Sequence, residues 1–132
     1  MVTHCLRLLD EEFGRDQYQR ARNELGRELM GFGWSREWPA SWKGARDIDS
    51  GAVIPGLEIS AGGSGMAFIA ASSFEDFKFL SSLHTTLEFA ALPKHEGGRL
   101  KYCASNQVGD AALLYAMVLG PIWEQAKQGI KP

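Results

Sequence analysis

The stretch from Phe32 to Gly65 constrains this chain more than any other feature. It holds three of the four tryptophans, a close pair of aspartates and, from Gly44 onward, six of the fifteen glycines. Irregular segments longer than about 12–15 residues are usually either functional or disordered, and a high aromatic content argues against disorder. We therefore expect an ordered loop over Phe32–Pro55 that folds over a site.

Length and charge limit the classes of protein to consider. The 132 residues suffice for one domain, which we place at 1–132. The net charge is −2, and lysines and arginines never cluster beyond two in a row, so a nucleic-acid partner is not predicted. Cys5 and Cys103 lack metal-ligand spacing, and we expect free thiols in a reducing compartment. No cofactor motif or metal-binding pattern is present, so neither group is predicted.

Targeting and membrane signals are also lacking in the sequence. The first residues contain no apolar core of a signal peptide, which makes the cytoplasm the default location. Ala52–Ala71 carries few charges, but Pro55, Glu58 and several glycines interrupt it and leucine is scarce. We therefore interpret this segment as a soluble helix that packs through small residues, and not as a membrane span.

The spacing of apolar residues predicts four helices. Apolar side chains recur at three- to five-residue steps, and glycine or proline follows three of the four segments. The segment Leu100–Cys103 is compatible with a short strand, which leaves that alternative open. The predicted fold class is all-α, made of antiparallel helical hairpins with one long ordered loop. The helices are expected at Val2–Met30, Gly56–Ser72, Ser73–Leu92 and Ala111–Leu119, with Gly120-Pro121 ending the last.

Two long loops separate these predicted helices, at residues 32–55 and 93–109. Alternate connections in an antiparallel helical array share one end, so both loops should lie on one face. Binding sites often form where loops meet on a rigid scaffold. We therefore expect a small-molecule pocket between them.

The aspartate pair in the first loop is the candidate catalytic pair. Asp47 and Asp49 lie one residue apart beside Arg46. A carboxyl shielded by a tryptophan would serve as a general acid, while one near Arg46 would stay ionised. The structural alternative is that Asp47 pairs with Arg46 or Lys43 and that Asp49 caps the turn at Ser50.

Aromatic residues supply the candidate ligand contacts. Tryptophans offer large apolar contact areas with one polar N–H, so they either line a ligand site or form a small core that holds the loop. His95 in the second loop is either a partner of the acidic pair or a surface histidine. The candidate ligand-binding residues are Trp34, Arg36, Trp38, Trp42, His95 and Tyr102.

The motifs Arg-Glu-Trp-Pro at 36–39 and Asp-Ile-Asp-Ser-Gly at 47–51 carry a family resemblance. With the small-residue segment that follows, and with Gly109-Asp110-Ala111, residues 36–119 resemble linalool dehydratase/isomerase-like proteins. The resemblance implies a toroid of the (α/α)6 type with a small-molecule pocket at its mouth, and only Asp47 and Asp49 carry over. Such a ring needs several hundred residues, whereas this chain offers about two hairpins.

Two functional hypotheses follow. Hairpins without their ring neighbours would expose apolar faces. The first hypothesis is therefore a self-associating helical protein, expected as a homodimer, that keeps the small-molecule pocket of the 32–55 and 93–109 loops. The second is an acid/base enzyme, a lyase, isomerase or glycosidase-like catalyst, that uses Asp47 and Asp49 in an aromatic-walled cleft.

Overall fold

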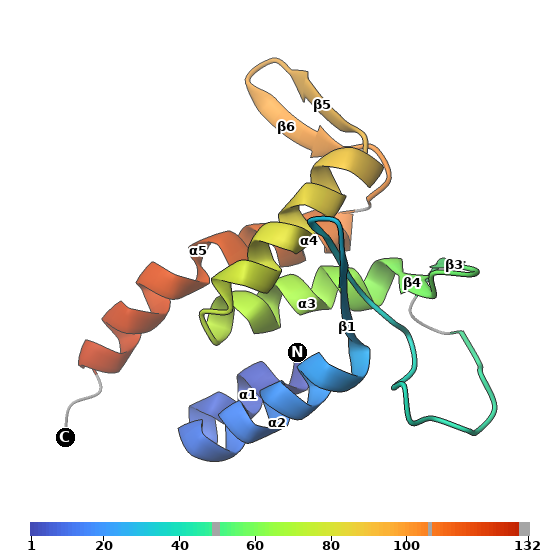
Figure 1. Cartoon of the computed structure of the whole chain (residues 1–132). Helices are drawn as coiled ribbons and strands as arrows, with labels where there is room; N and C mark the ends of the chain where they lie inside the picture. Colours follow the sequence, from blue (N-terminus) through green and yellow to red (C-terminus); the bar gives the residue numbers. More distant parts are fainter. Residues whose placement is uncertain (49–50, 106, 130–132) are drawn as a thin grey trace.

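Over residues 1–48, 51–105 and 107–129, the computed structural model describes a mixed α/β fold of five helices and six short strands (Figure 1). Side chains are described as far as Leu119. The helices are α1 (Val2–Leu9), α2 (Glu11–Leu25), α3 (Ala61–Ser73), α4 (Phe77–Ala90) and α5 (Gln107–Gly129). The strands are β1 (Gly26–Leu29), β2 (Phe32–Ser35), β3 (Val53–Ile54), β4 (Ile59–Ser60), β5 (Pro93–Glu96) and β6 (Arg99–Tyr102). The predicted all-α fold, and with it the α/α toroid, is therefore wrong.

The helix predicted over residues 2–30 is two helices and a strand. Asp10 has an extended backbone that ends α1, and its carboxylate accepts the Phe13 N–H at 2.9 Å to cap α2. After Gly26 the chain becomes β1. Met30 and Gly31 both have positive φ, at 52° and 85°, as the two-residue turn of a type I′ hairpin requires. The turn was missed because methionine is not a residue that signals this conformation.

The first hairpin belongs to a four-stranded antiparallel sheet with the order β1-β2-β4-β3. β2 pairs with β1 along its whole length and with β4 at Ser35 and Ser60. The predicted long loop thus begins with a strand, and residues 36–52 form the connection between β2 and β3. In Figure 1 this connection swings out from the sheet before it returns.

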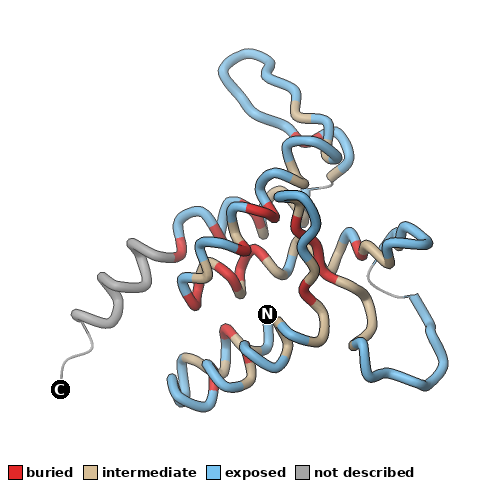
Figure 2. The backbone as a smooth tube through the Cα atoms, viewed as in Figure 1, coloured by how far each residue is buried: buried red, intermediate tan, exposed pale blue. Residues whose placement is uncertain are grey.

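The helix poor in large side chains, α3, is the centre of the fold. It contacts α5, α4, β2 and α1, and its Phe68, Ile69 and Ala71 are buried (Figure 2). Small residues let these neighbours approach its backbone, as the sequence predicted for an inner helix. The remaining core residues are Phe79, Leu83, Tyr102, Leu113, Ala116 and Leu119.

The second half differs from the prediction at its element ends. α4 begins after Asp76, whose carboxylate accepts the Phe79 N–H at 3.1 Å, while Ser73, the predicted first residue of this helix, ends α3. Within the predicted 93–109 loop, β5 and β6 form a hairpin around Gly97 and Gly98, both with positive φ. α5 continues through Pro121, because a proline removes one helical hydrogen bond without always ending the helix.

Polar bonds attach α1 to the core. His4 is only 4% exposed, and its Nδ1 and Nε2 lie 3.0 Å from Ser73 Oγ and from Tyr115 OH, respectively. Burial lowers the pKa of His4 below its ordinary 6.5, and the positive charges of the chain's α-amino group and Arg7 lower it further. The neutral imidazole therefore joins α1 to α3 and α5.

We predict that acid weakens the fold through His4. Because the folded-state pKa lies below 6.5, the unfolded chain takes up the proton first as the pH falls through that value, and stability falls with it. Urea unfolding at about pH 8 and at about pH 5 gives the difference in unfolding free energy between the two pH values. This difference should be smaller in His4→Asn and unchanged in His95→Asn, a control at an exposed position. An unchanged pH dependence in His4→Asn would refute the assignment.

The β1–β2 hairpin lies directly on α4. A Cβ atom on Gly33 would be 2.7 Å from Ser82 Cβ and 2.9 Å from the Leu83 nitrogen, closer than real Cβ contacts come. The Gly33 N–H donates to Thr86 Oγ1 at 2.9 Å. Glycine at this position therefore sets how closely the strand packs on the helix.

Gly33→Ala should destabilise the protein by about 1–3 kcal/mol, because the added methyl meets atoms that cannot yield without moving β2 or α4. Gly65→Ala is the matched control: its Cβ would have open space within 4 Å, and alanine favours a helix interior by up to about 1 kcal/mol. Urea unfolding should give opposite signs for the two variants, and equal effects would contradict the close packing.

Candidate functional site

The structure leaves the predicted catalytic pair without a shielded carboxylate among the residues it describes. Asp47 is exposed in the 36–52 connection, and Asp49 lies outside the described residues. An acid/base site of the kind predicted needs at least one carboxyl that the protein shields from water. That hypothesis now depends on Asp49 alone and stays a prediction.

The three tryptophans of the long loop do not form one wall. Trp34 is buried on β2, and its indole N–H donates to the Leu57 carbonyl at 3.1 Å. Trp42 is half exposed, and its N–H donates to the Ala45 carbonyl at 3.0 Å. Trp38 lies under the guanidinium of Arg46, 5.6 Å from its ring centre. Each ring has its own local partner, which fits the interpretation that they hold the loop in place.

Arg36, a predicted ligand contact, is held by an acidic residue on the far side of the loop. Its guanidinium forms an ion pair with Glu58, and Arg46 Nη1 lies 2.9 Å from the same carboxylate. The two arginines stand at the first and last positions of the segment 36–46. Glu58 thus fastens residues 36–46 as a closed segment.

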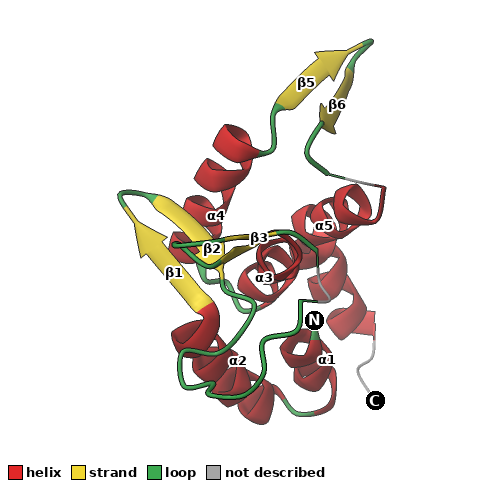
Figure 3. Cartoon of the chain, turned by 90° about the vertical axis from the view of Figure 1, so that its right-hand side faces the viewer, coloured by secondary structure: helices red, strands yellow, loops and turns green. Residues whose placement is uncertain are grey.

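The remaining predicted contacts lie on the second hairpin. His95 is exposed on β5. Tyr102 is buried at the base of β6, where its hydroxyl donates to Glu88 Oε1 at 3.0 Å, and burial together with that bond raises its pKa to about 12. Figures 1 and 3 both place the β5–β6 hairpin far from the 36–52 connection. His95 and Tyr102 are therefore not brought together with the tryptophans.

A groove of about 380 Å³ lies instead between the N-terminal helices and α3; we call it the α2–α3 groove. Its walls are mainly apolar, and Ser35, Arg36 and Glu37 stand at the start of the long loop, where they supply polar groups. Arg36 is the one predicted site residue that lines it. The apolar walls are made of Ala21, Leu25, Met66, Ala67, Ala70 and Phe79.

The polar residues of the groove are fixed by the first turn of α3. The buried hydroxyl of Ser60 donates to Glu37 Oε2 at 2.5 Å and accepts the Gly63 N–H at 2.9 Å. The Nε atom of Arg36 is buried and has no hydrogen-bond partner among the described residues. The groove therefore contains an oriented carboxylate, and the guanidinium of Arg36, paired with Glu58, lies in its lining.

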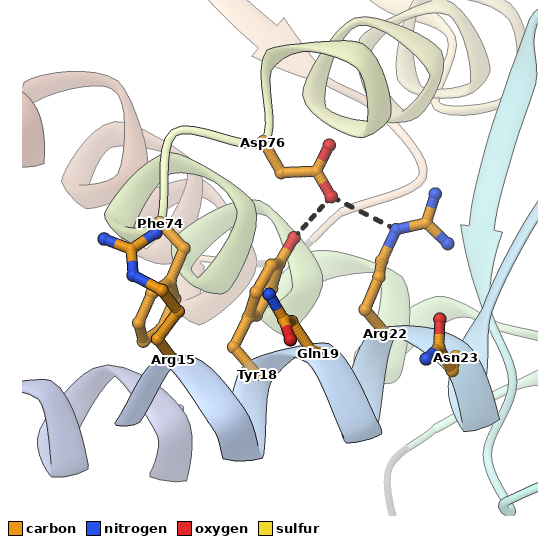
Figure 4. Close-up of a pocket in the computed structure, with 7 residues that line it drawn as sticks. All are labelled: Arg15, Tyr18, Gln19, Arg22, Asn23, Phe74 and Asp76. Atoms are coloured by element: carbon orange, nitrogen blue, oxygen red, sulfur yellow. Dashed lines mark hydrogen bonds and ion pairs between the residues drawn. The ribbon is translucent and has the colours of Figure 1, made fainter. Parts of the chain in front are cut away.

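A second, polar cleft of about 350 Å³ adjoins the groove, and we call it the Asp76 cleft. Figure 4 shows Tyr18 and Arg22 reaching from α2 toward Asp76. The Tyr18 hydroxyl donates to Asp76 Oδ2 at 2.8 Å, and Arg22 Nε donates to the same atom at 3.3 Å. Tyr18 and Arg22 line both the cleft and the groove, so they separate the two.

The electrostatics of the Asp76 cleft follow from partial burial. Burial alone would raise the pKa of Asp76, but the bonds from Tyr18, the Phe79 N–H and Arg22 together hold that pKa below its ordinary value. Burial, and then the bond to Asp76, raises the pKa of Tyr18. At neutral pH the tyrosine is thus a fixed donor and the aspartate a fixed anion.

Aromatic and cationic side chains support the cleft. Phe74 stacks on Tyr18 with ring centres 4.7 Å apart, and the guanidiniums of Arg7 and Arg15 lie 5.6 and 6.0 Å from the Phe74 ring centre. Arg22 lies 3.6 Å from the centre of Phe79. Cation–π contacts of this kind contribute about 0.5–2 kcal/mol each.

Neither Tyr18 nor Arg22 was among the site residues predicted from the sequence. The side chain of Arg22 is only 20% exposed, because Glu28 and Asp76 both pair with it. The spacing of four residues between Tyr18 and Arg22 puts them on one helix face and was the available signal. Asp76, 54 residues from Arg22 in the sequence, gave no such signal.

Comparisons with protein-family models, curated proteins and solved structures find no match to this chain. In the described part of the chain, no group of three or more histidines, cysteines and carboxylates is placed to hold a metal ion. No described helix is both long and apolar enough to cross a membrane. The site must therefore be interpreted from its own geometry.

Asp76→Ala should cost about 2–4 kcal/mol of unfolding free energy, because it removes the α4 cap and leaves the Tyr18 hydroxyl and Arg22 without that partner. Glu75→Ala, one residue away and exposed, should stay within about 0.5 kcal/mol of the parent. Urea unfolding measures both. A similar loss in the two variants would show that Asp76 does not join α2 to α4.

Proposed function

We propose that this chain binds a small, mainly apolar molecule with an acceptor oxygen in the α2–α3 groove. The observation that carries the proposal is the groove itself. Its volume of about 380 Å³ falls within the range of ligand pockets, which are typically apolar with a few convergent polar groups. The enclosing elements are helices and a strand, so the walls are held by the core.

The polar residues of the groove select the chemistry of the ligand. Arg36 lines the groove and pairs with Glu58 through one nitrogen, and the other N–H groups of its guanidinium are donors for a hydroxyl, carbonyl or acid oxygen. Glu37 is already oriented by Ser60, so it favours a ligand group that donates a hydrogen bond over a second anion. An alcohol meets both demands, since its oxygen accepts and its hydrogen donates.

This proposal moves the ligand site away from the 93–109 loop. Of the residues first expected to bind, it keeps Arg36. It requires no chemistry from Asp47 or Asp49, so it differs from the acid/base hypothesis in a testable way.

The uncharged fluorescent probe 6-propionyl-2-(dimethylamino)naphthalene, which has an apolar body and an acceptor carbonyl oxygen, tests the groove. Ala67 lines the groove and is half-buried. We expect Ala67→Phe to fill it and to weaken binding of the probe by about tenfold, with 1-octanol competing for the site in the parent chain. Far-UV circular dichroism checks that the variant is folded.

Two controls make the result specific. Leu114→Glu changes an exposed apolar position on α5 and should leave the affinity for the probe within about twofold. Arg36→Gln removes the charge and should weaken octanol competition even if Ala67→Phe does not fold. Unchanged binding in folded Ala67→Phe and in Arg36→Gln would overturn the proposal.

A further inference from the structure

The described side chains of α5 are apolar on both sides of the helix. From Val108 to Leu119 the only charged residue is Asp110, which is half-buried. Leu113, Ala116 and Leu119 face the core. Five large apolar side chains are nevertheless exposed, by 38–71%; we call them the α5 outer face, Val108, Leu114, Tyr115, Met117 and Val118.

Helix geometry places these five residues together. At about 100° per residue, Leu113, Ala116 and Leu119 fall in an arc of about 120°. The α5 outer face occupies roughly the opposite half of the helix, without a charged residue among its five members. Helices that are apolar all round are normally covered on every side. Figure 1 shows α5 at the edge of the molecule, where no other element covers its outward side.

The surface area of the whole chain agrees with a missing partner. The chain exposes 8844 Å², whereas a monomer of 14.5 kDa is expected to expose about 6,900 Å². This excess of about 1,900 Å² is spread over the whole chain, including the projecting long loop and β5–β6 hairpin, and each partner in an interface of standard size buries roughly 800 Å². One chain therefore leaves enough surface uncovered for a stable interface.

We propose that the α5 outer face is the interface of a homodimer, in which α5 packs against α5 of a second copy. Pairing about a two-fold axis needs only one self-complementary patch. Asp110 lies on the same half of α5, one turn before Leu114, whereas Leu114–Val118 carries no charge and forms the centre of the patch. The net charge of −2 adds little repulsion between copies. The bond from Tyr115 OH to His4 fixes one ring of the patch before association.

The test is the solution mass of the full 132-residue chain by sedimentation equilibrium at micromolar concentrations. The expected mass is twice 14.5 kDa. The double variant Leu114→Glu/Met117→Glu should weaken dimerisation by about a hundredfold or more, because it buries charges at the centre of the patch. The matched control is Met30→Glu, at a 91% exposed apolar residue on the distant β1–β2 turn, which should remain dimeric.

Each outcome decides the proposal. A monomeric parent chain overturns it, and so does a dimer that survives the α5 double variant or dissociates equally in Met30→Glu. If the double variant misfolds by circular dichroism, Val118→Cys on a chain with Cys5 and Cys103 changed to serine replaces it. Mild oxidation should then cross-link two copies through Val118→Cys, and absence of that product overturns the proposal. Probe binding in the α2–α3 groove is measured separately, so the two proposals fail independently.

Discussion

The arrangement of the N-terminal half depends on the hydrogen bonds that the carboxylate of Asp76 accepts. It caps α4, and it accepts hydrogen bonds from Tyr18 and Arg22 of α2. The second connection of this half is His4, which joins α1 to Ser73 and Tyr115. Both connections are hydrogen bonds between side chains, so the length of those side chains sets the separation of the elements. As a result α2 does not pack directly against α3. The space that remains is the α2–α3 groove.

The walls of this groove are fixed by hydrogen-bonded side chains, which distinguishes it from a gap left by poor packing. Tyr18 and Arg22 form a wall between the groove and the Asp76 cleft, and their positions are fixed by stacking on Phe74 and Phe79. The opposite end is fixed by the Ser60 hydroxyl and Glu37. Groups held in this way are oriented before a ligand arrives, which lowers the entropy cost of binding. The acidic and basic residues of this region thus shape the site even where they do not line it.

The sequence predicted several elements well because their signals are local. The helical character of α2, α4 and α5 followed from spacing, and so did most of α3, although the helix predicted from Gly56 begins at Ala61, after a turn and β4. The hairpin at 26–35 was missed because Met30 occupies a left-handed position where glycine or asparagine normally gives the signal. The strands β3 and β4 have only two residues each, too few for alternation to be visible.

The candidate site was harder to predict because it is built from residues distant in the chain. Arg22 pairs with Asp76 across 54 residues, and Glu37 bonds to Ser60 across 23, so spacing alone could not join them. The tryptophans drew attention to the long loop, but each of these rings contacts a partner of its own within the protein. Asp49 lies outside the described residues, which leaves its role as first predicted. The resemblance to toroid proteins rested on short motifs, and those motifs do not determine how the helices between them pack.

The two arginines on Glu58 make the long loop responsive to ionic strength. Arg46 is 53% exposed in its pair and Arg36 only 17%, so dissolved salt screens the Arg46 contact first. In dilute buffer Arg36 and Arg46 both pair with Glu58, whereas in concentrated salt the Arg46 pair weakens and the Arg36 pair persists. How firmly the loop is held on Glu58 thereby depends on the surrounding solution as well as on the fold.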